Sequence, residues 1–418
     1  MTAGTGEAVL TTRYERRAAA VSCGAHALHD GFTDLIYVML PVWQAEFGIG
    51  YAELGFLRAL YAGSMATFQI PSGLLAERVG DAALLALGTA LAGIGYCLAG
   101  ASAGIAPLML ALFFSGLGSS TQHPLASSLM AHAFAGSRSM KAIGAYNFAG
   151  DIGKMTVPAV AALLIAVMPW RPVLALLGAV GVLAGAAIFV CMPRAHGPAA
   201  RPDAAHAQPE LQPKLQPEQA HAWSGASRFA FPLLVAIGML DSGTRMGFLL
   251  FLPFVLTAKG ASLPTLGLAL TLVFTGGAAG KLVCAWIGAR IGTIATVWLT
   301  ESLTALLILA LLILPLEAAL LLLPAVGIAL NGTSSVLYGS VPDLVAPERR
   351  TRAFSVFYTG TVGTGAVGPV IYGAIGDLFG VTAGVVSVAL IVLLTLPLSL
   401  ALKTTAGEGS IRAAGQRS

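Results

Sequence analysis

Three ionisable side chains recur at one-turn intervals in the first long apolar stretch of the chain. His26, Asp30 and Asp34 are spaced i, i+4 and i+8, so they share one face of a helix. From a helix end near Ala19, Asp30 lies about 16 Å along the axis. Two carboxylates one turn apart repel each other when both are ionised, so one of them should hold a proton. This pattern predicts a proton carrier, although His26 by itself could simply bond a backbone carbonyl.

A second group of ionisable residues lies in two later apolar stretches. His123 and Asp151 each fall about 15 Å from the nearer end of their stretches, so antiparallel helices would hold them at one depth. A His–Asp pair could relay protons or orient a substrate. Lys154 is three residues after Asp151 and shares its face. A neutral buried polar network is the alternative interpretation.

In the second half of the chain, Asp241 and Arg245 are again one helical turn apart. They could neutralise each other as a structural pair. Arg245 is also the best candidate to bind an anionic group, because its planar fork matches carboxylate or phosphate. Further hydrogen-bonding or charged candidates for substrate binding are Lys281, Gln69, Tyr146, Asn147, Asn331 and Tyr338.

The composition indicates that these residues lie in a membrane. Of the 418 residues, 56% are hydrophobic and only 10% are charged, whereas soluble proteins carry roughly 25% charged residues. An ionisable side chain at the centre of a bilayer costs about 2.5–3.5 kcal/mol on insertion scales, so each needs a partner or a function.

Apolar runs long enough to cross about 30 Å of hydrocarbon recur along the chain. Because lipid offers no partner to open backbone groups, each must span as a helix. The sequence therefore predicts an all-α membrane protein of twelve transmembrane helices in two six-helix bundles. The runs are 19–46, 52–76, 83–101, 106–134, 141–167, 171–192, 229–257, 264–289, 294–315, 318–340, 353–376 and 382–402.

One segment without apolar periodicity divides the spans six and six. Residues 193–228 are rich in Pro, Ala, Gln and His, which predicts a disordered cytoplasmic linker. The predicted organisation is a tail (1–18), a first bundle (19–192), the linker, a second bundle (229–402) and a tail (403–418). The first span has no small-residue cleavage site, so we expect it to remain as a helix and not to be a signal peptide.

Lys and Arg predict the orientation. They gather at the ends that would be cytoplasmic if the N-terminus is inside, which places both termini in the cytoplasm of a bacterial inner membrane. Similar patterns of polar residues and glycines also recur in the two halves at an offset of about 210 residues, as in the parallel repeats of transporters.

The loop after the second span carries a recognisable motif. Residues 73–81 read Gly-Leu-Leu-Ala-Glu-Arg-Val-Gly-Asp, and a weaker copy at 288–292 contains Arg290. This resembles the major facilitator superfamily motif Gly-x-Leu-Ala-Asp-Arg-x-Gly-Arg-Lys, with Glu77 in place of Asp and Asp81-Ala82 in place of the basic pair. The resemblance implies a gating role for Gly73, Glu77, Arg78, Gly80 and Arg290; an exposed pair of little energetic value is the alternative.

A second string, Gly116 to Ala126 with His123-Pro124 at its centre, resembles the superfamily branch named for fosmidomycin-resistance exporters, as does His-x-x-x-Asp at 26–30. That branch implies proton-driven efflux of a small polar or drug-like compound. The Gly-x-x-x-Gly-Pro motif usual in antiporters of the superfamily is not matched, since the glycines at 144, 150 and 153 precede a proline only at 158.

We therefore expect a proton-coupled secondary exporter, with import of a small organic anion as the alternative and a non-transporting membrane sensor as a remote one. No Gly-x-x-x-x-Gly-Lys-[Ser/Thr] loop, His-Glu-x-x-His or Gly-x-Ser-x-Gly motif occurs, so neither ATP-driven transport nor enzyme activity is expected. We expect no cofactor, no metal and no nucleic-acid partner; the expected partners are a small-molecule substrate, protons and lipid. A monomer is expected by resemblance.

Overall fold

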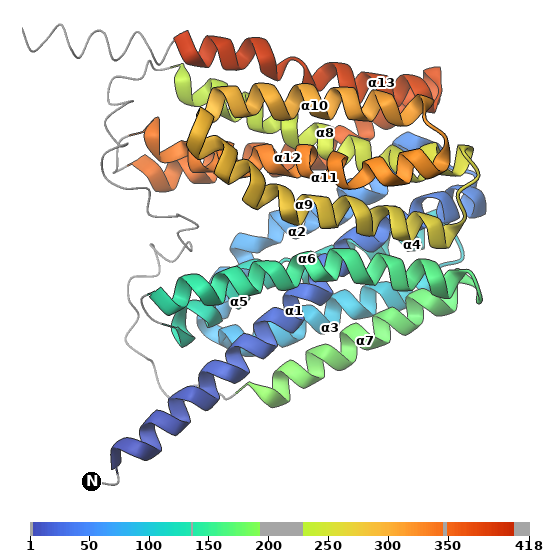
Figure 1. Cartoon of the computed structure of the whole chain (residues 1–418). Coiled ribbons are helices and arrows are strands. Elements are labelled where there is room, and N and C mark those ends of the chain that lie inside the picture. Colours follow the sequence, from blue (N-terminus) through green and yellow to red (C-terminus); the bar gives the residue numbers. More distant parts are fainter. Residues whose placement is uncertain (1–2, 135–136, 193–228, 346–348, 405–418) are drawn as a thin grey trace, which may run out of the picture. The chain divides into compact units, whose positions relative to one another are not determined.

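The computed structural model describes residues 3–134, 137–192, 229–345 and 349–404, and within these ranges every regular element is a helix (Figure 1). The predicted linker and most of the C-terminal tail lie outside the described residues. The first seven helices are α1 (Ala3–Phe47), α2 (Tyr51–Val79), α3 (Asp81–Gly100), α4 (Ile105–Ser119), α5 (Gln122–Ala133), α6 (Ser137–Ile165) and α7 (Trp170–Cys191). The others are α8 (Ala230–Ala258), α9 (Leu263–Ile291), α10 (Thr293–Ile313), α11 (Leu316–Gly339), the short 3₁₀ helix η3 (Val341–Asp343), α12 (Arg350–Phe379) and α13 (Val381–Val392).

Every predicted span coincides with one helix or with two consecutive helical segments, which confirms the all-α prediction. The predicted span 106–134 is divided into α4 and α5 at Ser120 and Thr121. Pro124 explains the break, because it has no N–H and its ring clashes with the carbonyl four residues earlier. The last span is divided similarly: α13 ends at Val392, and a further helical segment, 395–404, contains Pro397.

Ten of the described helical segments are long and apolar enough to cross a membrane, with α4 and α5 counted as parts of one. The two remaining predicted spans are α1 and α2, which are also long enough. They contain charged residues within the apolar stretch, such as Asp30 and Asp34 in α1 and Arg58 in α2. These charges account for the lower hydropathy of the two helices.

The chain forms two compact units, and α1 and α2 are each divided between them. The first unit comprises the residues up to Val38 together with those from Leu60 to α7. Within it, α3 packs along α7, with Gly93 against Gly178 and Gly181. Small residues let membrane helices approach closely. Leu85, Leu125 and Met130 belong to its buried core.

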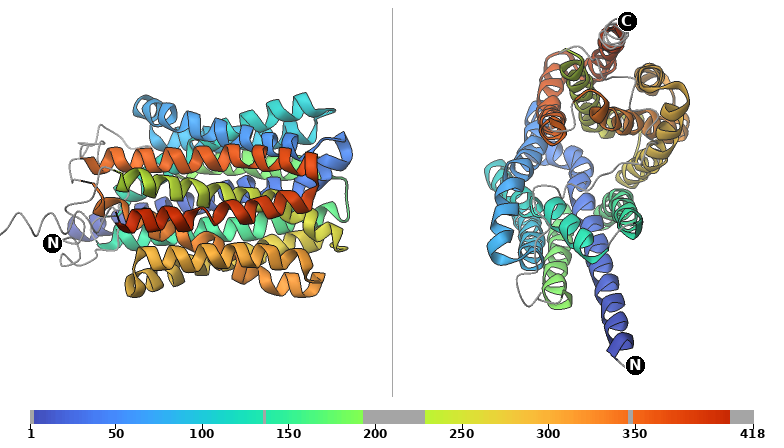
Figure 2. Two further views of the ribbon diagram at one scale, coloured as in Figure 1. Left: turned by 90° about the horizontal axis from the view of Figure 1, so that it is seen from above. Right: turned by 90° about the vertical axis from the view of Figure 1, so that its left-hand side faces the viewer.

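The second unit comprises Met39–Ala59 and the described residues from Phe229 onward. Here α9 packs along α11, and α8 packs along α12 (Figure 2 shows the helices from two further directions). A buried cluster that includes Leu234, Leu337 and Phe357 lies at one end of this unit.

An unusual contact in the second unit joins the start of α2 to the end of α12. The Asp377 carboxylate accepts hydrogen bonds from the backbone N–H groups of Tyr51, at 2.7 Å, and Ala52, at 2.9 Å. These N–H groups have no partner within their own helix, because the first turn of a helix leaves its donors unpaired. A negative charge at this end also interacts favourably with the helix dipole. Asp377 therefore acts as a cap supplied by another helix.

We expect Asp377→Ala to lower the free energy of unfolding by about 1 kcal/mol, the typical loss for a removed helix cap. Asp377→Asn keeps one oxygen acceptor and should lose less. Thermal unfolding of the detergent-purified protein measures both against the wild type. Equal unfolding midpoints for Asp377→Ala and the wild type would contradict the capping role.

Candidate functional site

Two glycines bring α6 against the ionisable face of α1. A Cβ added to Gly150 would lie 2.5 Å from Asp30 Oδ2 and 2.7 Å from His26 Cε1. A Cβ on Gly153 would lie 1.8 Å from the carbonyl oxygen of Ala27. A larger residue at position 153 would meet backbone and separate the two helices, and one at position 150 would displace the Asp30 and His26 side chains, so the glycines of α6 let its side chains meet those of α1.

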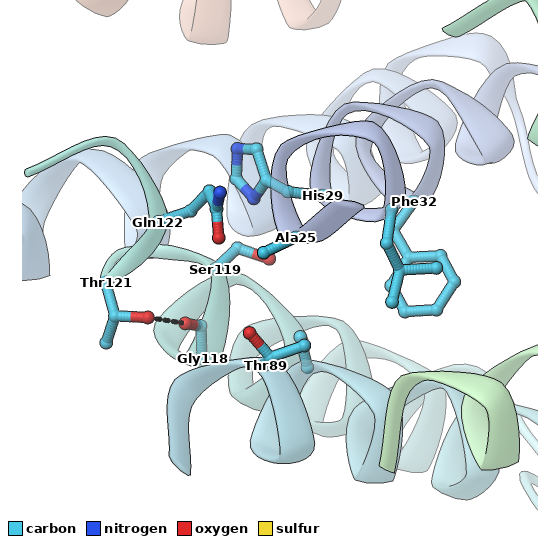
Figure 3. A pocket seen from close by; sticks show the side chains of 10 residues that line it. Ala25, His29, Phe32, Thr89, Gly118, Ser119, Thr121 and Gln122 are labelled. Carbon is cyan, nitrogen blue, oxygen red and sulfur yellow. Dashed lines mark hydrogen bonds between the residues drawn. The ribbon is translucent and has the colours of Figure 1, made fainter. Parts of the chain in front are cut away.

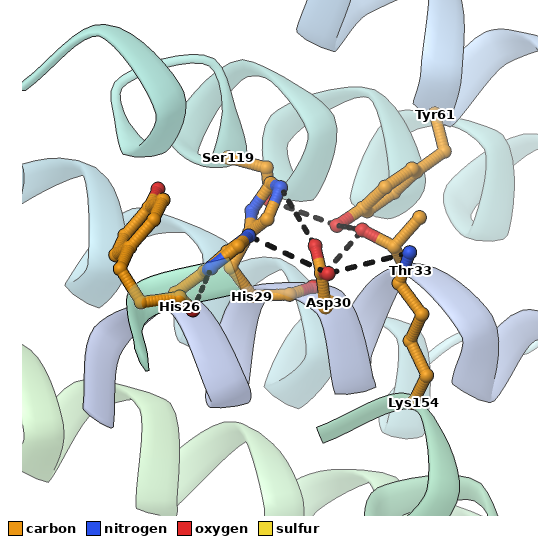
Figure 4. Close-up of polar contacts among 8 residues, drawn as sticks. His26, His29, Asp30, Thr33, Tyr61, Ser119 and Lys154 are labelled. Carbon is orange, nitrogen blue, oxygen red and sulfur yellow. Dashed lines mark hydrogen bonds and ion pairs between the residues drawn. The ribbon is translucent and has the colours of Figure 1, made fainter. Parts of the chain in front are cut away.

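Asp30 is the centre of the resulting cluster (Figure 4). The residue is 8% exposed. Its Oδ2 lies 3.3 Å from Lys154 Nζ on α6 and 3.4 Å from His26 Nε2. His29 Nε2 lies 3.8 Å from Oδ1. The sequence predicted that His26 shares a face with Asp30, but it did not predict the ion pair with Lys154.

The orientation of His26 is fixed by its second nitrogen. Nδ1 lies 2.8 Å from the backbone carbonyl oxygen of Tyr146, and the two rings stack with centroids 4.0 Å apart. A carbonyl can only accept, so Nδ1 carries the proton and donates it. Nε2 therefore faces the Asp30 carboxylate, and these two acceptors repel unless a proton lies on one of them. A proton on either group would turn the contact between His26 and Asp30 into a hydrogen bond.

Two further imidazoles complete this cluster. The His123 ring, on α5, lies edge-on to His26 at 5.4 Å and to His29 at 4.9 Å between centroids. His29 also lines a small pocket with Phe32, Ser119 and Gln122 (Figure 3). The sequence placed His29 on a different face from His26 and did not select it as a site residue.

A chain of hydroxyl groups lies beside the pocket. The Tyr61 hydroxyl is 2.8 Å from Ser119 Oγ and 3.3 Å from Thr33 Oγ1, and the Thr33 hydroxyl donates to the His29 carbonyl at 2.9 Å. Hydroxyl groups both donate and accept, so such a chain can pass a proton along. It extends the polar contacts of α1 to α2 and α4 (Figure 4).

Asp34 and Asp151, the two other predicted carboxylates of this unit, are both buried. Both lie within electrostatic reach of Lys154. One ammonium group thus interacts with three carboxylates on α1 and α6, and it lies 3.3 Å from the Asp30 carboxylate.

Three side chains of the same cluster lie close enough together to be considered as metal ligands. One ligand atom each from His26, Asp30 and His123 lies within 4.8 Å of the others. The Lys154 ammonium already neutralises Asp30 at 3.3 Å, and a divalent ion beside it would be repelled. We therefore assign no metal to these residues.

The second unit contains its own ionisable group in the membrane. Arg245 Nη2 donates to Asp241 Oδ2 at 3.0 Å, as the i, i+4 spacing predicted. Glu301, on α10, is 1% exposed and meets Asp241. The sequence analysis did not select Glu301, although an acid within the apolar run 294–315 carries the same cost of burial in a membrane as Asp30.

The remaining predicted substrate residues are scattered. Asn331 donates to the Gly327 carbonyl of its own helix at 3.1 Å, and Tyr338 packs on Phe354 with ring centroids 4.8 Å apart. Tyr146 is buried against His26, as described. Gln69 and Asn147 are half-buried, and Lys281 is exposed.

The predicted gating residues lie at helix ends. Glu77 and Arg78 are exposed in the last turn of α2, and Gly80 ends the helix with a φ of 92°, in the left-handed region that favours glycine. Arg290, near the end of α9, lies over the Trp286 ring at 3.9 Å, which is a cation–π contact.

Comparison with known proteins identifies the fold and the family. Two structures of a bacterial homolog to the human lysosomal transporter Spinster, both inward-facing, superimpose on this chain. The occupied form has a TM-score of 0.74 at 16% identity and covers 94% of this chain and 97% of its own; the unoccupied form has 0.75 at 15% and covers 95% and 98%.

One curated relative is the multidrug resistance protein MdtL of Shewanella oneidensis, 24% identical over 167 residues. That match spans 40% of this chain and 42% of the relative. The model of the Major Facilitator Superfamily matches residues 23–238 and 234–417, which together cover nearly the whole chain. The chain is therefore an all-α, multi-pass membrane transporter that belongs to the major facilitator superfamily.

Proposed function

We propose that this transporter exports a small polar or drug-like compound in exchange for protons, by alternating access. The observation that supports proton coupling is the contact between His26 Nε2 and Asp30 Oδ2 at 3.4 Å. His26 Nδ1 donates to a carbonyl, so a proton must lie between Nε2 and the carboxylate for the contact to be favourable. Histidine is the side chain that changes charge most readily near neutral pH.

The Lys154 ammonium competes with this proton for the Asp30 carboxylate. It lies 3.3 Å from the same Asp30 oxygen, and Asp34 and Asp151 offer it other carboxylates. When Asp30 takes a proton, its attraction for Lys154 falls and Lys154 can turn to another acid. Proton binding therefore changes the charge pairing between α1 and α6, which is what coupling to a conformational change requires.

The direction of transport rests on resemblance. The string from Gly116 to Ala126 and the His26–Asp30 spacing resemble the fosmidomycin-resistance exporters, and the partial relative is named a multidrug resistance protein. Import of a small organic anion is the second candidate. It is favoured by Arg245, whose Nε has no hydrogen-bond partner among the described residues and could take an anionic group.

The test is proton movement in proteoliposomes that hold the purified protein and a pH-sensitive dye. The vesicles are challenged with phosphonates, organic acids and hydrophobic cations. We expect at least one compound to elicit a dye signal that is absent from protein-free vesicles. Silence across the panel, with binding still detected by thermal shift, would contradict proton coupling.

Membrane vesicles of defined orientation then separate the two directions. An exporter should load the compound into inside-out vesicles whose interior has been acidified by respiration. An importer should load it into right-side-out vesicles instead, with a preference for anions. Glu317→Gln, a change at an exposed acid, is the control that should behave like the wild type in both preparations.

A further inference from the structure

Two buried carboxyl groups in the second unit, Asp241 and Glu301, lie beside a single positive side chain. Asp241 on α8 is 3% exposed and Glu301 on α10 is 1% exposed, and the two side chains meet within hydrogen-bonding contact. The positive group that faces them is the Arg245 guanidinium, bonded to Asp241 Oδ2 at 3.0 Å. Two carboxylates and one guanidinium would leave a net charge of −1 in an apolar interior.

Among the residues that the structure describes, none of the groups packed around the pair from α9, α11 and α12 supplies a second positive charge. From α9 the titratable neighbour is Cys284, which is buried and neutral as a thiol. From α11 the neighbour is Thr333, whose hydroxyl contacts Glu301 and donates to Thr300 at 2.7 Å. From α12, Tyr372 contacts Thr244 beside Asp241. The charged residues of α9, Lys281 and Arg290, are exposed.

An uncompensated charge in a medium of low dielectric constant costs far more than binding a proton, so such groups neutralise. A shared proton also converts the repulsion between two carboxylates into a hydrogen bond. A metal cation is a poorer solution, because it would have to sit next to the guanidinium that already pairs with Asp241.

We propose that Asp241 and Glu301 together bind one exchangeable proton, which makes the second unit a proton-binding site separate from the Asp30 cluster. Glu301 donates its O–H to the Asp241 carboxylate, and Arg245 holds the other side of that carboxylate. On release the proton passes to water and leaves two carboxylates on one guanidinium. The role of this proton in transport rests on the proposed function, but its presence does not.

Infrared absorption of the purified protein at neutral pH tests the proposal, since the C=O stretch of a protonated carboxyl group is separate from that of a carboxylate and shifts in heavy water. We expect this band in the wild type. The band should lose the intensity of one carboxyl group in Glu301→Gln and equally in Asp241→Asn, because either change leaves one carboxylate balanced by Arg245; any protonated acid of the Asp30 cluster contributes the same intensity in all these proteins. Glu317→Gln, at an exposed acid, should keep the full band.

Three results would overturn the proposal. One is the absence of the band from the wild type, and another is its survival at full strength in either Glu301→Gln or Asp241→Asn. The third is a rise in thermal stability with sodium at neutral pH that Glu301→Gln abolishes, which would assign the pair to a metal cation. The infrared spectra need no substrate and no pH gradient. They therefore test the proton on the Asp241–Glu301 pair even if no compound elicits a dye signal in the transport assay.

Discussion

Asp30→Asn is expected to reduce compound-driven proton movement in proteoliposomes to the level of protein-free vesicles. Asparagine has the size of aspartate but cannot take up a proton, and it cannot form the ion pair with the Lys154 ammonium, which now lies 3.3 Å from Asp30. His26 would keep its bond to the Tyr146 carbonyl but would face an uncharged amide. Binding of protons and the exchange of Lys154 between acids are lost together.

The variant should still insert and fold, because Asp34 and Asp151 remain within reach of Lys154. Size-exclusion chromatography and thermal unfolding check this, and Glu317→Gln supplies a folded variant with normal flux. Proton movement that persists in a folded Asp30→Asn protein would remove Asp30 from the mechanism.

Lys154 provides the reciprocal experiment. Lys154→Gln should lower the free energy of unfolding by about 2 kcal/mol, less than the 3–5 kcal/mol typical of a broken buried pair. The reduction is expected because 31% of the Lys154 side chain is exposed and His26 can share part of the charge. Adding Asp30→Asn to Lys154→Gln should restore most of the lost stability but no proton movement. Additive losses in the double variant would show that the two residues do not interact.

The sequence predicted the helices well because lipid leaves the backbone few choices. A run of apolar residues about 20 long has to become a helix in hydrocarbon, and the observed α3, α7 and α9 each follow the predicted spans closely. The break before α5 was not predicted. It depends on Pro124, whose effect on a helix in a membrane varies with the partners available to the freed carbonyl.

The candidate site could be predicted only within single helices. The one-turn spacings placed His26 with Asp30 and Asp241 with Arg245, and both contacts are present. The contact of Lys154 with Asp30 joins two helices, and it depends on their rotation and register. Periodicity along one helix does not contain that information, which is why Lys154 had been grouped only with its own neighbour Asp151.

Glu301 was missed for a different reason. It is a single acid in its apolar run, and no second ionisable residue one helical turn away forms a pattern with it. The cost of a buried charge applies to it as much as to Asp30. Its partner lies on α8, about 60 residues earlier in the chain, so only the packing of α10 against α8 joins them.

Gly153→Ala is expected to be the most damaging small substitution in the first unit. The added methyl group would lie 1.8 Å from the Ala27 carbonyl oxygen and 2.6 Å from its carbon, and backbone atoms cannot turn aside. The helices α1 and α6 must then separate, at a cost of about 3 kcal/mol or more in unfolding free energy. Thermal unfolding in detergent measures this loss.

Gly144→Ala is the matched control, since it lies on the same helix with nothing within 4 Å of the added Cβ. It should raise stability by up to about 1 kcal/mol, because alanine favours the helix. Gly153→Ala removes no ionisable side chain, so a loss of proton movement in the folded variant would arise from the larger distance between α1 and α6. Normal stability and flux in Gly153→Ala would mean that the close approach of α1 and α6 is not what holds Lys154 against Asp30.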